Sequence, residues 1–361
     1  MPVGTPFHER TLALCESLNY REWSGYYTVS VYETHHEHEY NAVRNSAALI
    51  DISPLYKYRV TGPDATRLGE NEYRWTAADP SLRWFQQNAL GLDVQLEDIY
   101  EQLAALALQD PTSSKLLHAA ADASIANLKY FRVAHGKIAG VPVDISRTGY
   151  TGDLGYEIWV PWNDAVKVWD KLMTMGKIFD IHPAGMIALD IARIEAGLIL
   201  IEVDYTSSKR ALIDSQRYTP SEIGLGKLVD LKKESFVGRD ALIEEAKHGP
   251  ERALVGLELD WNEVEAVYDK IGMAPQVASM ASRVAVPVYR GGRQVGKATS
   301  TTWSPTLKKM IALACVGRPH STLGTTLHIE MTVEAQRKTV AAKIVPIPFF
   351  NPPRKTAVPV L

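Results

Sequence analysis

The chain has 361 residues, which is enough for two or three domains with cores of their own. Hydrophobic residues make up 46% and charged residues 22%, and 39 Lys and Arg against 42 Asp and Glu leave a net charge of −3. This balance provides no basic excess for nucleic acid or an anionic membrane, and the apolar runs are too short to cross a bilayer, so we expect neither partner.

The thiols and histidines give no sign of a metal site. Cys15 and Cys315 are the two cysteines, and their spacing fits neither a zinc site nor a disulfide framework. His35, His36 and His38 lie close together, but no carboxylate stands at ligand spacing, so we interpret them as a surface cluster. With few cysteines and no targeting pattern at the start of the sequence, we expect a cytoplasmic protein without a metal.

The first two thirds of the sequence alternate between helix-like and strand-like segments. Apolar spacing and capping residues predict helices over 40–50, from 111, over 163–175 and over 183–196, the first leading into a strand near 48–51 and the last ending at Gly197. Hydroxyls at 112–114 and Asn163 or Asp164 are available as helix caps. Alternation and β-branched residues predict strands over 48–51, 56–60, 104–108, 129–133 and 141–146, the last two paired around a turn at Gly136.

The last third of the sequence is rich in short strands. A polar stretch over 247–252 predicts a boundary, and beyond it six strands are expected at 253–259, 285–289, 294–299, 311–316, 326–331 and 339–344, with Gly291 and Gly292 in a hairpin connection. Six short strands in about a hundred residues are typical of a small antiparallel barrel or sandwich. We therefore predict one domain over 1–247, a barrel domain over 252–350 and a tail over 351–361.

The segment 147–158, Arg-Thr-Gly-Tyr-Thr-Gly-Asp-Leu-Gly-Tyr-Glu-Ile, carries the strongest chemical signal. Its three glycines allow tight turns and close backbone approach, and Glu157 follows at the start of an apolar strand. A carboxylate there accepts two parallel hydrogen bonds from a planar heterocycle, and Tyr150 adds an aromatic face. By themselves the residues also fit a glycine-rich hairpin with a glutamate at its edge, so both interpretations stay open at this point.

This segment resembles the pteridine-binding signature of the glycine cleavage T-protein (aminomethyltransferase) family. Further landmarks of that family follow the same order along the chain, at 43–53, 60–65, 106–111, 192–198 and 304–313. The resemblance implies an α+β fold, with ferredoxin-like subdomains arranged as a cloverleaf around a central folate site and followed by an antiparallel β-barrel. It also implies a one-carbon transferase that moves an aminomethyl, methylene or methyl group to tetrahydrofolate.

The resemblance assigns site residues one by one. Glu157 would hold the amino edge of the pteridine, and Tyr150 would line the same pocket. Arg193 matches the family helix together with Glu195, either as a folate contact or as a structural ion pair. Trp303 would face the central cavity or pack against neighbours. Trp23 aligns loosely with an N-terminal aromatic segment and is the weaker candidate.

Three departures from the family pattern affect the activity. The chain is shortened near 67–70, and the missing block holds the family's catalytic aspartate, for which Asp64, Asp79 and Asp93 offer no matching motif. The catalytic residue is therefore unknown. Leu189 stands where many members have an arginine that reaches folate. Asp110 replaces a glycine, which predicts local strain of roughly 1 kcal/mol if the backbone there has a positive φ.

Three functions follow from the resemblance and its departures. The first is an aminomethyltransferase acting with a lipoyl H-protein. The second is a folate-dependent demethylase of a small methylated compound, which Leu189 and the sequence Ser53-Pro54-Leu55 favour. The third is a folate-binding protein without transfer activity, because the segment with the aspartate is missing.

Overall fold

The computed structural model describes residues 1–63, 72–122 and 125–359, and these form two compact units. The first unit comprises residues 1–192 together with the C-terminal residues from Pro352, and the second comprises residues 193–351. The predicted boundary at 247–252 is not where the units divide, and the domain limits stay a prediction. The predicted shortening near 67–70 lies outside the described residues.

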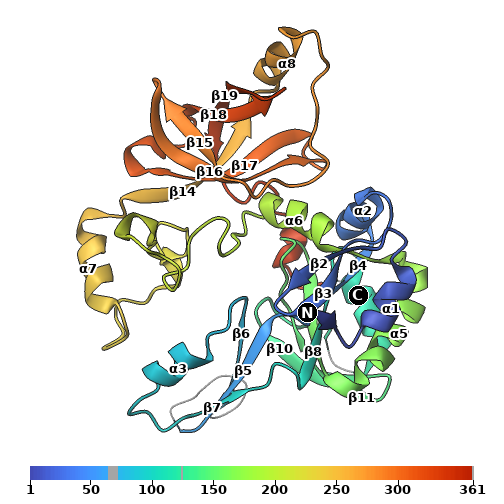
Figure 1. The fold of residues 1–361 in the computed structure, drawn as a ribbon. Coiled ribbons are helices and arrows are strands. Elements are labelled where there is room, and N and C mark those ends of the chain that lie inside the picture. Colours follow the sequence, from blue (N-terminus) through green and yellow to red (C-terminus); the bar gives the residue numbers. More distant parts are fainter. Residues whose placement is uncertain (64–71, 123–124, 360–361) are drawn as a thin grey trace. The chain divides into compact units, whose positions relative to one another are not determined.

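Three sheets form the described part of the first unit (Figure 1). The largest has the strand order β13-β4-β8-β12-β11-β10-β9 and is mostly antiparallel. Two three-stranded sheets, β1-β3-β2 and β6-β5-β7, accompany it. The strand bounds are β1 Val3–Gly4, β2 Asn19–Trp23, β3 Tyr26–Val31, β4 Ala47–Asp51, β5 Tyr56–Thr61, β6 Glu72–Ala77, β7 Gln95–Asp98, β8 Leu103–Gln109, β9 Ala121–Asp122, β10 Val133–Ile138, β11 Val141–Ser146, β12 Gly155–Pro161 and β13 Ile181–Pro183.

The two faces of the large sheet have different cores because side chains alternate along each strand. Leu106 and Ile158 lie in the core that α4 and α5 cover, with Trp169 of α5 as its largest side chain. Ala105 and Ala107 point to the opposite face, where residues of α2 and α6 pack. The helix bounds in this unit are α1 His8–Leu14, α2 Glu37–Asn45, α3 Leu82–Asn88, α4 Ser113–Ala120, α5 Ala165–Gly176 and the start of α6 Met186–Glu195.

The second unit contains a closed barrel of six antiparallel strands, which confirms the prediction of an α+β protein with a C-terminal barrel. Its order is β14-β17-β16-β15-β18-β19, and Leu257, Ala312 and Val340 are among the fully buried side chains that fill it. The bounds are β14 Arg252–Leu259, β15 Val286–Arg290, β16 Arg293–Ser304, β17 Lys309–Gly317, β18 Thr326–Val333 and β19 Gln336–Val345, with helices α7 Arg239–His248 and α8 Trp261–Asp269.

Local predictions were wrong at the hairpin of β10 and β11, whose first strand is Val133–Ile138 and not 129–133, and at two helix caps. The turn between β10 and β11 lies at Ala139 and Gly140, both with positive φ, rather than at Gly136, which pairs within the strand. A two-residue turn with positive φ matches the twist of a hairpin, and this determines the register. The hydroxyl of Thr112 does not cap α4 but donates to the carbonyl of Ser46 at 2.7 Å, and Asp164 makes no side-chain cap to α5.

Candidate functional site

Glu157 lies in β12, on the sheet face opposite to α4 and α5. In the register of the sheet it stands between Ser146 of β11 and Ala107 of β8, while its neighbour Ile158 enters the opposite core. Glu157 is half-buried, so its carboxyl group has lost much of its water but is still reachable.

Burial raises the pKa of Glu157 to about 7, although the positive charge of Arg74 and the hydroxyl of Ser146 both favour the ionised form. Arg74, from β6, is tied elsewhere: its guanidinium lies 2.5 Å from the Asp144 carboxylate and 4.6 Å from the centre of the Trp159 ring. Arg74 therefore acts on Glu157 through its positive charge, while its hydrogen bond goes to Asp144.

The predicted ligand fits this environment. Glu157 is a partly desolvated carboxyl group, and its pKa of about 7 places it between its two protonation states near neutral pH. A group that brings two N–H donors, such as the amino edge of a pteridine, satisfies it and favours the ionised form. The sequence did not point to Asp144, Trp159 or Arg74, although alternation along 144–146 and 157–159 places Asp144, Ser146, Glu157 and Trp159 on one face.

The glycines before Glu157 have a packing reason. A Cβ atom on Gly149 or on Gly155 would lie about 2 Å from the side-chain oxygen of Gln109, so neither position admits another residue without displacing it. Gln109 is fully buried and donates to the carbonyls of Thr148 and Tyr156 at 3.4 and 3.3 Å. These bonds hold the loop between β11 and β12, residues 147–154, against β8. The close approach predicted from the glycines is therefore made to a side chain of the protein itself.

Tyr150 lies in this loop and is half-buried. It precedes Gly152, whose φ of +79° gives the loop its sharp turn. Tyr150 and Glu157 belong to the same unit and to the same continuous segment, seven residues apart.

Asp110 occupies a strained and buried position. Its φ is +88°, a conformation that glycine adopts at little cost but other residues rarely adopt. The side chain is fully buried, and one carboxyl oxygen accepts from Thr151 at 3.2 Å while the other has no hydrogen-bond partner. Burial raises the pKa of Asp110 well above its usual range. The condition attached to the predicted strain, a positive φ, is thus met.

Arg193 is buried within the second unit. Its guanidinium donates to Asp204 at 2.6 Å, to Ser300 at 2.8 Å and to the carbonyl of Leu198 at 3.3 Å, and the side chains of Arg193 and Asp204 are each 1% exposed. A β-bulge in β16 directs Thr299 and Ser300 toward Asp204. This network fits the alternative interpretation of Arg193 as one member of a structural ion pair, with Asp204 as the partner.

Trp303, Glu195, Trp23 and Leu189 all contact other residues of the protein. Trp303 lies against the barrel core, with its ring centre 5.3 Å from that of Trp261. Glu195, the other residue of the family helix, accepts from Ser304 at 2.5 Å. Trp23 and Leu189 both pack on the sheet face that carries Ala105 and Ala107.

Of the three acidic residues considered as replacements for the family's catalytic aspartate, the structure describes Asp79 and Asp93. Asp79 lies in a turn whose carbonyl accepts from Ser81, and Asp93 is exposed. Asp64, the third acidic residue considered, lies outside the described residues.

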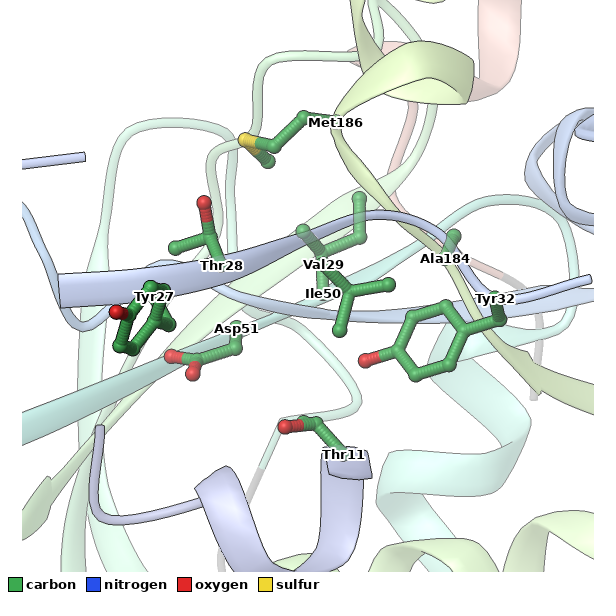
Figure 2. A pocket seen from close by; sticks show the side chains of 9 residues that line it. All are labelled: Thr11, Tyr27, Thr28, Val29, Tyr32, Ile50, Asp51, Ala184 and Met186. Carbon is green, nitrogen blue, oxygen red and sulfur yellow. The ribbon is translucent and has the colours of Figure 1, made fainter. Parts of the chain in front are cut away.

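A second polar enclosure lies elsewhere in the first unit. Figure 2 shows side chains of β3, of the end of β4 and of α1 gathered around a cavity. The cavity has a volume of about 10 Å³, and its lining includes Thr11, Tyr27, Tyr32, Asp51 and Met186. Asp51 accepts from the Thr5 hydroxyl at 2.6 Å and from the Ser53 amide at 2.9 Å, and burial raises its pKa. A space of this size holds about one water molecule, so it is too small for a pteridine.

Similarity to known proteins agrees with this architecture. The model of the GCVT N-terminal domain matches residues 65–233, and that of the glycine cleavage T-protein C-terminal barrel domain matches residues 271–351. The aminomethyltransferase of Bacillus subtilis is 31% identical, over 87% of this chain and 90% of its own length. The trimethylamine-oxide aldolase of Ruegeria pomeroyi is 32% identical over 98% of this chain, which spans only 47% of that relative.

A solved structure shares the fold. The glycine cleavage aminomethyltransferase T of Bartonella henselae superposes with a TM-score of 0.79, covering 97% of this chain and 99% of its own, at 21% identity. The alignment with the Bacillus subtilis enzyme is 357 positions long but includes only 87% of the 361 residues of this chain. The other aligned positions are gaps in this chain, so the relative has residues there that this chain lacks.

An α+β unit with a partly buried carboxyl group on the sheet face opposite to α4 and α5, followed by a six-stranded barrel, together with these relatives defines a transferase of one-carbon groups. The chain belongs to the glycine cleavage T-protein (aminomethyltransferase) family. Membership confirms the expected cofactor of the family, tetrahydrofolate. Among the described residues, no helix is both long and apolar enough to cross a membrane.

Proposed function

We propose that this chain binds tetrahydrofolate with the amino edge of the pteridine against Glu157 and with Tyr150 in the same pocket. Glu157 carries the proposal because it is a carboxyl group partly withdrawn from water with its pKa raised to about 7, next to a small alanine side chain. Such a group gains most from a ligand that supplies N–H donors. When bound, tetrahydrofolate supplies the nitrogen that receives the one-carbon unit.

The neighbours of Glu157 have supporting roles in this proposal. Arg74 provides positive charge near the carboxyl group, and Asp144 and Trp159 keep the guanidinium in place. The Ser146 hydroxyl accepts from the Trp159 indole at 3.2 Å and so links β11 to β12 at the level of Glu157. Together these side chains would orient the ligand and hold Glu157 in its ionised form.

The donor is the open part of the proposal, and two classes are supported. Aminomethyltransferases among the relatives support an aminomethyl group, which a lipoyl H-protein would present as partner. The trimethylamine-oxide aldolase relative supports a small methylated amine. Leu189 favours the second class, because it packs with apolar neighbours where an arginine would offer charge. We place the reaction in the cytoplasm, in keeping with two free, buried thiols.

A folate-binding protein without transfer activity is the alternative, since no aspartate takes the expected place in the described residues. Isothermal titration with tetrahydrofolate separates the possibilities. Micromolar binding supports the pocket, and formation of methyl- or methylene-tetrahydrofolate from a methylated amine or from aminomethylated H-protein then identifies the donor. Binding without turnover on either donor favours the alternative, and absence of binding refutes the proposal.

A further inference from the structure

The residues after Pro352 form part of the first unit, although they follow the barrel in sequence. Arg354 donates through Nε and one terminal nitrogen to the two carboxyl oxygens of Asp153, both at 2.6 Å. The Asp153 side chain is fully buried, so this bidentate pair neutralises a charge that water does not reach. The two partners lie 201 residues apart in sequence.

A second arginine holds the same segment from the other end of the glycine-rich loop. Arg147 is fully buried and donates through one terminal nitrogen to the carbonyl oxygens of Arg354, Lys355 and Ala357, at 3.4, 3.2 and 2.5 Å. Its other terminal nitrogen donates to the carbonyl of Leu128 at 2.9 Å. The guanidinium therefore fixes the backbone of the C-terminal segment rather than an acidic side chain.

These two attachment points lie at the two ends of the loop that carries Tyr150. Arg147 begins the loop and Asp153 ends it, so a single short segment bridges both ends. The segment is itself stiff, because prolines at 352 and 353 open its short 3-10 helix, Pro353–Lys355. Close by, Asp110 is buried with one carboxyl oxygen unpartnered, and the charge of Arg354 acts on it.

We propose that the C-terminal segment Pro352–Ala357 acts as a strap that positions the Tyr150 loop for folate binding, with Arg354 and Arg147 as positioning residues. The inference rests on the proposed function of Tyr150. Without the strap, Asp153 is left as a buried and unpaired carboxylate beside Asp110, and the loop gains other conformations. The fraction of molecules with Tyr150 in place then falls, and the apparent affinity falls with it.

Hydrogen exchange and folate titration on the full-length Arg354→Gln variant test the strap. We expect faster amide exchange over 148–152 and a tetrahydrofolate affinity lower by about tenfold. Arg337→Gln is the matched control, since Arg337 is exposed and only loosely paired with Glu330 at 3.7 Å, and it should change neither quantity. Arg354→Lys keeps the positive charge without the bidentate geometry, so its tetrahydrofolate affinity should lie between those of the wild type and Arg354→Gln. If Arg354→Gln does not fold, the same two measurements on Arg354→Lys test the strap.

A double-mutant cycle separates positioning from general stabilisation. If the strap acts through Tyr150, then Tyr150→Ala weakens binding much less in the Arg354→Gln background than in the wild type. Unchanged exchange over 148–152, or additive losses in the cycle, would overturn the proposal. If wild-type protein does not bind folate, the proposed function fails, but the exchange measurement still decides whether the strap orders the loop.

Discussion

Replacing Glu157 by glutamine should stabilise the free protein and weaken its binding of folate. Burial raises the pKa of this carboxyl group from 4.5 to about 7, so the folded chain binds its proton more tightly than the unfolded chain does. Stability therefore falls as pH rises between these two values. At pH 8 the ionised group costs the folded state about 3 kcal/mol, and at pH 5 about 1 kcal/mol. Glutamine, which is neutral and nearly the same shape, removes this cost.

Urea unfolding at both pH values measures the effect. We expect Glu157→Gln to raise the unfolding free energy by about 3 kcal/mol at pH 8 and by about 1 kcal/mol at pH 5. Glu234→Gln is the control, because Glu234 is exposed and should give no change at either pH. In the same variant we expect tetrahydrofolate affinity to fall by roughly 1.5–3 kcal/mol, since a charge-assisted acceptor is lost. A variant less stable than wild type at pH 8, or one with unchanged folate affinity, would refute the reasoning.

Three further outcomes are expected. Because ligand donors favour ionised Glu157, wild-type folate affinity should rise between pH 6 and pH 8 while that of Glu157→Gln stays flat, as titration calorimetry at a series of pH values would show. Asp110→Gly removes the strain of a side chain at positive φ and a buried unpartnered oxygen, so thermal unfolding at neutral pH should show a gain of about 2 kcal/mol, and a loss would contradict the strain. Arg193→Met leaves Asp204 buried and unpaired, so urea unfolding should show a loss of about 3–5 kcal/mol; a change below 1 kcal/mol would mean that the pair is dispensable.

The stabilising and destabilising charges of this protein fall in different places. The pair of Arg193 and Asp204 is satisfied by neighbouring hydroxyls and holds the second unit together. Glu157 and Asp110 are less well satisfied carboxyl groups in the first unit, and burial raises the pKa of both. Of these two, Glu157 is half-buried and Asp110 is fully buried at a positive φ, which is why a ligand role is proposed for Glu157 and a strain role for Asp110.

The sequence alone was sufficient to predict most helices and strands and to propose Glu157 as the residue that contacts the ligand. Helical spacing over 163–175 and the glycine at 197, which has φ of +66°, are properties of a short window, and the structure has α5 and the end of α6 there. The six barrel strands were predictable for the same reason. Glu157 was found through a motif of twelve consecutive residues, and the family to which the chain belongs was predicted from that motif and its companions.

Other features were decided by the tertiary structure, because they join residues that no local pattern connects. Arg74 contacts Trp159 only because β6 lies beside the face of β12 in the folded unit. Asp204, the ion-pair partner of Arg193, also accepts from Thr299 and Ser300, which a bulge in β16 brings to the same carboxylate. Thr112 was a reasonable helix cap by type, but the carbonyl of Ser46 competes for its hydroxyl. The 201 residues between Asp153 and Arg354 likewise hide a bidentate pair. Propensity and periodicity act over one or two turns of chain, whereas a buried charge finds its partner only when the whole unit has packed.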